Sequence, residues 1–216
     1  MLFLALLPVL FGLRVFADPI DIQFPHMLLP LKESQPNIAF KTQPDAIVGF
    51  NVKTLPPQQP YPAHTNLAHQ SLTGDEQWTA VNFDVPDHGN TLCHVNFHIN
   101  TNTAKNAPIG LKGQAPFAIN ISRIDPKLVN GGTTWNNKPA TIEHVATFVL
   151  DKNLGASEIV GKWFACPKGL AQFVVHPAGE RDLETYWYEL DYSKADGGRM
   201  VLLLRCSPKF QILGVA

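Results

Sequence analysis

The sequence predicts an all-β protein, an antiparallel β-sandwich of about ten strands with a long Pro-rich surface loop. Short segments of alternating or continuous apolar residues recur along the chain, separated by Gly, Pro, Asn and Asp. The chain has 18 prolines in 216 residues, and a proline inside a helix would cost about 3 kcal/mol. Hydrophobic residues make up 45% and charged residues only 16%, which indicates a packed core rather than a disordered chain.

The predicted strands share an apolar pattern of period two or an uninterrupted apolar run. They are HMLLPL (26–31), AIVGFNV (46–52), WTAVNFDV (78–85), LCHVNFHI (92–99), PFAINISRI (116–124), HVATFVLD (144–151), EIVGKWFAC (158–166), AQFVVH (171–176), TYWYELDY (185–192) and RMVLLLRC (199–206). Turn-forming residues separate many of them, as at 86–90, 130–132, 167–169 and 195–198. No segment gives a convincing helical pattern.

Residues 1–17 are almost wholly apolar and are followed by Asp18. Val15 and Ala17 are compact residues that fit the cleavage site of a signal peptide. A membrane anchor is the alternative, but the uninterrupted apolar run ends at Leu13 and is too short for about 30 Å of hydrocarbon. We therefore expect a signal peptide over 1–17, one secreted domain over 18–216, and no stable membrane insertion.

Residues 54–77 interrupt the strand pattern. Four prolines between Pro56 and Pro62 favour a polyproline II conformation and exclude a central strand. One interpretation is a ligand for an SH3-type domain, but such a partner is absent outside the cell. We expect a long surface loop.

Export also determines how the three cysteines are interpreted. Cys93, Cys166 and Cys206 are far apart and lack the C-x-x-C spacing of a zinc site. In an oxidising compartment two of the three are expected to form a disulfide, and all three pairings remain open. The third cysteine is either a small buried hydrophobe, which we expect, or a bonding partner for another chain.

A glycosylation sequon is present at Asn120-Ile121-Ser122. Along this predicted strand Phe117, Ile119 and Ile121 would face the core, so Asn120 and Ser122 would face solvent. We predict a glycan on Asn120. The alternative is an unmodified asparagine on an exposed strand.

The sequence predicts no catalytic residues, metal site or cofactor. A serine hydrolase elbow, GxSxG, is absent. His94 and His98 would share a strand face, but about 13 Å of strand rise separates them, too far for one metal ion. The formal net charge of −1 gives the chain no excess positive charge that would attract nucleic acid. We expect a protein that is not an enzyme.

Carboxylates and aromatic residues are concentrated in the stretch 180–192. Glycosidases and sugar-binding faces combine these side chains as acid–base groups and stacking platforms. The candidate binding residues are Glu184, Tyr186, Trp187, Tyr188 and, in a separate loop, Trp135. Ordinary cross-strand packing is the alternative for the strand, and plugging one end of the sandwich is the alternative for Trp135. A groove lined by the strand residues, with two carboxylates about 5–10 Å apart, would favour a carbohydrate-active enzyme, whereas burial of the aromatics would exclude one.

Six segments, taken in order, resemble the fungal family of But-two C-terminal-domain proteins. They are FPHMLLPL, VNFDVP, TLCHVNFHIN, TTWNNKP, WFACPKG and VLLLRC. The resemblance extends over roughly residues 24–206 and makes the Pro-rich segment 54–77 an insertion. It implies a secreted or cell-wall-associated protein with a β-sandwich-like domain and no assigned catalytic residues. The founding member's name implies binding to the activating enzyme of a ubiquitin-like modifier.

Together these observations predict a secreted, non-enzymatic protein that acts by interaction at a cell wall or host surface. Its expected partner is a cell-wall polysaccharide or a host surface protein. The alternative is a carbohydrate-binding or carbohydrate-active protein that uses the strand within 180–192.

Overall fold

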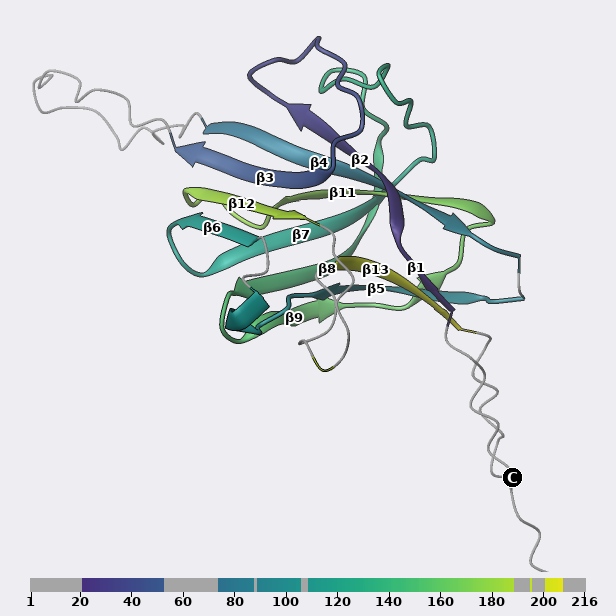
Figure 1. The fold of residues 1–216 in the computed structure, drawn as a ribbon. Helices are drawn as coiled ribbons and strands as arrows, with labels where there is room; N and C mark the ends of the chain where they lie inside the picture. The colour runs from purple at the N-terminus through teal and green to yellow at the C-terminus, as the bar shows by residue number, and fades with distance from the viewer. Residues whose placement is uncertain are drawn as a thin grey trace, which may run out of the picture.

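The computed structural model describes residues 21–52, 74–87, 89–105, 109–188, 195 and 201–207. Within these residues the chain forms two antiparallel sheets and one short 3-10 helix, η1 (Thr103–Lys105), which confirms the all-β prediction (Figure 1). The expected signal peptide at 1–17 and residues 54–73 of the expected Pro-rich loop lie outside the described residues. Among the residues that are described, no helix has the length and apolar character needed to cross a membrane.

The larger sheet has nine strands in the order β6-β12-β3-β4-β11-β7-β8-β9, and β2 pairs with β4 beside this path. Its strands are β2 (Pro25–Lys32), β3 (Asp45–Val52), β4 (Gly74–Val85), β6 (Ile109–Gly113), β7 (Phe117–Ile124), β8 (Thr141–Asp151), β9 (Gly155–Gly161), β11 (Gly169–Pro177) and β12 (Leu183–Tyr188). The smaller sheet has the order β1-β13-β5-β10. Its strands are β1 (Asp21–Gln23), β5 (Leu92–His98), β10 (Phe164–Ala165) and β13 (Val201–Ser207).

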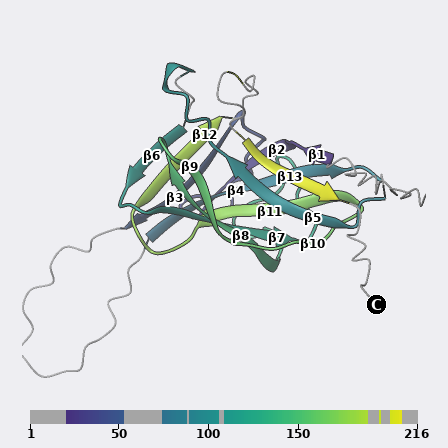
Figure 2. The same cartoon turned by 90° about the horizontal axis from the view of Figure 1, so that it is seen from below.

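The main core lies between the two sheets, which Figures 1 and 2 show stacked with β5 and β13 against the larger sheet. Phe83, Phe148, Phe173 and Trp187 from the larger sheet are almost completely buried there. Phe97 of β5 packs against two of them, with ring centroids 5.0 Å from Trp187 and 6.2 Å from Phe148. Burial of each such side chain contributes about 1.5–3 kcal/mol. The alternation of apolar and polar residues in these strands therefore places one face of each sheet in a shared core.

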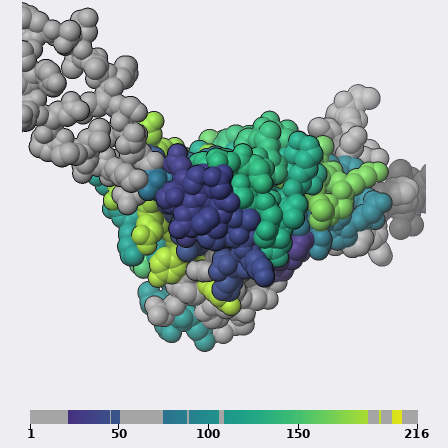
Figure 3. Space-filling view, turned by 90° about the horizontal axis from the view of Figure 1, so that it is seen from above, coloured from purple at the N-terminus to yellow at the C-terminus, as the bar shows by residue number. Residues whose placement is uncertain are grey.

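A second, smaller core covers part of the opposite face of the larger sheet. Its residues come from β2, β4, β7 and β11, with partly buried side chains packed on them: Met27, Leu29, Leu31, Ala80, Ile124 and Val174, with Trp78, Leu128 and Trp135. The loops at 33–44 and 125–140 lie side by side over this face (Figures 1 and 3). The N–H of Gly131 donates to the carbonyl of Phe40 at 3.1 Å and joins the two loops. This part of the sheet is therefore closed to solvent.

Several boundaries differ from the prediction. Two strands were not predicted: β1 is only three residues long, and Gly110 and Gly113 weaken the strand signal of β6. The predicted strand 158–166 is two strands in different sheets, β9 and β10, separated after Gly161. Residues 74–77, predicted as part of the Pro-rich loop, begin β4 and pair with β3. These residues are polar and lack the apolar pattern that predicts a strand. They form one because their backbone pairs with that of β3.

Candidate functional site

Strand β12 places the predicted binding residues on two opposite faces. Leu183, Thr185 and Trp187 point into the core, whereas Glu184, Tyr186 and Tyr188 point outward, in the alternation expected of a strand. Trp187 is fully buried. The prediction that it contacts a ligand is therefore wrong, because the two-residue period of the strand assigns it to the core.

The outward side chains of β12 lie between β6 and β3. Glu184 is opposite Lys112 of β6 and Gly49 of β3. The ammonium group of Lys112 donates a hydrogen bond to Oε1 of Glu184 at 2.8 Å. This hydrogen bond, together with the negative charge of Glu184, raises the pKa of Lys112. Both side chains are largely exposed, so the pair is a surface feature that is screened by salt.

Tyr186 lies over the backbone of β6. Its ring occupies the space that a Cβ atom at Gly110 would need, so the glycine permits the ring to cover the neighbouring strand. Tyr186 is 39% exposed and Tyr188 is 40% exposed. Two residues along a strand correspond to about 7 Å, so the two phenol groups form a short row. We call Lys112, Glu184, Tyr186 and Tyr188, with Gly110 beneath, the tyrosine face.

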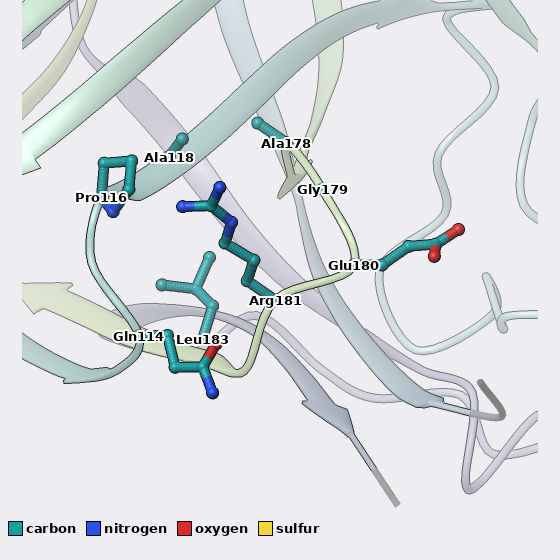
Figure 4. A pocket seen from close by; sticks show the side chains of 8 residues that line it. All are labelled: Gln114, Pro116, Ala118, Ala178, Gly179, Glu180, Arg181 and Leu183. Carbon is teal, nitrogen blue, oxygen red and sulfur yellow. The ribbon is translucent and has the colours of Figure 1, made fainter.

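A small pocket lies just before β12, where the turn after β11 meets the turn between β6 and β7. Its volume is about 330 Å³, near the lower limit for small-molecule sites. Arg181 extends over it and donates to the carbonyl of Ala115 at 3.4 Å, whereas Glu180 points away from it (Figure 4). Glu184 does not line it. The structure therefore separates the predicted stretch into a pocket with one arginine and an open tyrosine face.

Trp135 lies away from the tyrosine face. It is half-buried in the loop 125–140, and its ring centroid is 4.9 Å from that of Trp78 in an edge-to-face contact. The ammonium group of Lys138 is 3.8 Å from the Trp135 ring centroid. These contacts attach the loop to the second core, so Trp135 packs against the sheet and does not join the other predicted binding residues.

A cluster of polar side chains, not anticipated as a group, lies on the outer face of β7, β8 and β11. Ser122 Oγ is 3.1 Å from Nε2 of His176, and Thr147 Oγ1 is 2.9 Å from Nε2 of His144. Burial is the largest cause of a lowered pKa for both histidines. In the sequence only the sequon at Asn120 indicated a feature in this region. The grouping of the two histidines could not be predicted, because they come from strands far apart in the sequence.

The predicted glycan acceptor belongs to the same cluster. Asn120 is half-buried, and its Oδ1 accepts a hydrogen bond from Thr147 Oγ1 at 2.7 Å. The two residues are directly opposite across β7 and β8. Glycosylation of Asn120 stays a prediction, and a glycan there would extend from the outer face of the sheet.

Ser122 and His176 have the separation of a nucleophile and a base, but their surroundings do not suit catalysis. Ser122 is 4% exposed, so a substrate cannot reach its oxygen. The second ring nitrogen of His176 is 3.1 Å from the carbonyl of Pro177, where a catalytic triad would hold a carboxylate. The pair holds neighbouring strands together.

The predicted disulfide is present between Cys93 and Cys166, whose Cα atoms are 4.9 Å apart. Cys206 is fully buried, as predicted for the third cysteine. The bond connects β5 with the residue that follows β10.

Comparison with known families decides the identity of the domain. Residues 50–190 match the family model described as "Ubiquitin 3 binding protein But2 C-terminal domain". The chain belongs to this family. The But2 match includes the tyrosine face and the Cys93–Cys166 disulfide, and the family is described by a binding function rather than by a reaction. No curated protein matches the chain.

Proposed function

We propose that this But2-family chain is an exported, non-enzymatic binding protein that recognises cell-wall polysaccharide through its tyrosine face. The observation that carries the proposal is the pair Tyr186 and Tyr188, which are adjacent on one strand face and each about two-fifths exposed. A phenol ring offers an apolar surface on which a sugar ring stacks and a hydroxyl group that forms hydrogen bonds.

The polar part of the face complements the aromatic part. Lys112 donates hydrogen bonds and Glu184 accepts them, and both retain donor or acceptor capacity beyond their mutual hydrogen bond. Sugar hydroxyl groups serve either role. The low charge content of the chain, 16%, favours a neutral polysaccharide over a polyanion.

The same face favours binding over hydrolysis. Glycoside hydrolysis needs two carboxyl groups about 5–10 Å apart on either side of the scissile bond. Glu184 is the carboxylate of the tyrosine face, and it is paired with Lys112. Glu180, the carboxylate beside the pocket, points away from it (Figure 4).

Sedimentation of the purified protein with insoluble chitin, β-1,3-glucan and cellulose tests this proposal. We expect the wild-type protein to bind at least one of these polymers. The double variant Tyr186→Ala/Tyr188→Ala should bind about five- to 150-fold more weakly, because each lost stacking contact is worth about 0.5–1.5 kcal/mol.

Trp163→Ala is the matched control because Trp163 is an aromatic residue of similar exposure, 47%, outside the tyrosine face. It should bind like the wild type. Equal binding by the double variant and the wild type would exclude the tyrosine face, and no binding of the wild type to any of the polymers would exclude the polysaccharide.

Export is tested separately by expression in a eukaryotic secretory host. We expect the mature protein in the medium to begin at Asp18 and to carry glycan mass that is lost in Asn120→Gln. Retention inside the cell with residues 1–17 intact would contradict export.

A protein of the ubiquitin group is the second candidate ligand, and the description of the matched family favours it. Titration of the isotope-labelled chain with ubiquitin distinguishes it from the first. Shifts of backbone signals in β3, β6 and β12 would assign the tyrosine face to a protein partner instead of a polysaccharide.

A further inference from the structure

The three cysteines come together at one end of strand β5, although they are far apart in the sequence. In the smaller sheet β5 lies between β13 and β10. Cys93 of β5 is directly opposite Cys206 of β13 on one side and opposite Phe164 of β10 on the other. Cys166 follows β10, and its N–H donates to the carbonyl of Thr91 at 3.0 Å, which holds it beside β5. Cys93 is therefore the central member of the group.

The sulfur atoms are close enough to react with one another. Cys93 Sγ is bonded to Cys166 Sγ, and the Sγ of Cys206 lies 2.8 Å from the Sγ of Cys93. All three sulfur atoms lie within 4.8 Å of one another. The arrangement places a third sulfur directly against one end of an existing disulfide.

We propose that Cys93, Cys166 and Cys206 form a thiol–disulfide exchange site in which the Cys93 sulfur bonds to either neighbour. The thiolate of Cys206 attacks Sγ of Cys93, the Cys93–Cys206 bond forms, and the Cys93–Cys166 bond breaks. Cys166 leaves as a thiolate and takes up the proton that Cys206 released. One disulfide and one thiol are present before and after, so the step needs no oxidant or reductant.

Exchange moves the thiol from the interior to the surface. Cys93 and Cys206 are both fully buried, whereas Cys166 is half-buried at the edge of the smaller sheet. After exchange the thiol is at Cys166, where a small disulfide or an alkylating reagent can reach it. The product is therefore a site for S-thiolation that the starting disulfide conceals.

The two disulfide isomers differ in which strand they fasten. Strand β13 is paired with β5 at seven positions, so the backbone holds it in either isomer. Strand β10 is paired with β5 at only two positions. Release of Cys166 therefore loosens residues 162–168, which include Phe164, now 5% exposed, with its ring 5.8 Å from that of Phe173. The exchange couples thiol exposure to detachment of the sheet edge.

Disulfide mapping of the wild-type full-length chain is the first test. The protein is incubated without added thiol at pH 8, where thiolate formation favours exchange. It is then unfolded in acid, which stops exchange and exposes the buried Cys206, alkylated with N-ethylmaleimide and digested. We expect two linked peptide pairs, Cys93–Cys166 and Cys93–Cys206, and alkylation at both Cys206 and Cys166. Detection of the Cys93–Cys166 pair alone, with alkylation confined to Cys206, would overturn the proposal.

Two single variants separate the partners. Cys166→Ser should still contain a disulfide, Cys93–Cys206, seen as the loss of two hydrogen masses. Cys206→Ser should contain only Cys93–Cys166, with loss of all alkylation at Cys166. A Cys166→Ser protein recovered with both remaining thiols reduced, from conditions that oxidise the wild type, would also overturn the proposal.

Trypsin reports the change at the sheet edge, because Lys162 and Lys168 flank β10. We expect faster cleavage at these two lysines in Cys166→Ser than in Cys206→Ser, with the other tryptic sites cut at equal rates. Equal cleavage at Lys162 and Lys168 in both variants would contradict release of the edge.

Discussion

Two lysines beside aromatic rings lie on the outer face of the larger sheet, and their pKa values are shifted in opposite directions. Lys112, next to Tyr186 on the tyrosine face, has a raised pKa because its ammonium group donates a hydrogen bond to the negatively charged Glu184. Lys138 lies over Trp78 and Trp135, with 5.0 and 3.8 Å between its ammonium nitrogen and the ring centroids. Burial lowers its pKa.

The loops account for this difference. Residues 33–44 and 125–140 lie over the second core, against which Trp78 and Trp135 pack, whereas the tyrosine face keeps its aromatic rings about two-fifths exposed. Aromatic and basic residues therefore do not by themselves identify a binding surface. The same residue types stabilise the fold where loops cover them and are available to a ligand where the sheet is bare.

The largest predicted difference concerns stability. Trp135→Ala should reduce the free energy of unfolding by about 2–3 kcal/mol, below the 3–5 kcal/mol typical of a fully buried tryptophan, because Trp135 is only half-buried. Tyr188→Ala on the bare face should change it by less than about 0.5 kcal/mol. Urea unfolding followed by circular dichroism measures both. Equal losses would show that the two regions do not differ in their contribution to the fold.

Gly110 gives a second, smaller contrast. A methyl group there would collide with the Tyr186 ring, so Gly110→Ala should destabilise the protein by about 1–2 kcal/mol and displace the ring. Polysaccharide binding should weaken with it. Gly179→Ala is the control, because an added Cβ at Gly179 meets no atom within 4 Å. If Gly110→Ala unfolds at the same urea concentration as Gly179→Ala, the ring does not rest on β6.

A pH titration compares the two histidines on the outer face of β8 and β11 with the tyrosine face. His144 and His176 have folded pKa values below the ordinary value of 6.5, so the unfolded chain binds protons first as the pH falls. Their contribution to stability is fully present above pH 6.5 and is lost progressively as the pH falls from that value through the lower pKa values of the folded state. Lys162, on one side of His144, adds to the shift.

We expect the urea concentration at the unfolding midpoint to decrease when the pH is lowered from 7.5 to 5. In the double variant His144→Gln/His176→Gln this decrease should be smaller. Tyr186→Ala/Tyr188→Ala should retain the full pH dependence of the wild type. An unchanged slope in the histidine double variant would show that other groups cause the loss.

The sequence predicted the parts of this comparison that depend on local periodicity. Alternation identifies the strands that carry both regions, and applied strictly to β12 it also separates buried Trp187 from exposed Tyr186. The contact between Trp78 and Trp135 could not be predicted, because a loop that returns to a distant strand creates it. The disulfide pairing was open for the same reason: the strand order β13-β5-β10 brings all three cysteines to one place.

The smallest predicted effect returns to the two lysines. Lys138→Gln removes an ammonium group that lies over two rings and donates to the carbonyl of Trp135 at 2.9 Å, so it should lower stability by about 0.5–1 kcal/mol. Lys112→Gln should leave the urea midpoint unchanged at low and high salt, because water already solvates that ion pair. If Lys112→Gln nevertheless weakens polysaccharide binding, the lysine contributes to ligand recognition without contributing to the fold. If instead Lys112→Gln lowers the midpoint as much as Lys138→Gln does, exposure is not what separates the two regions.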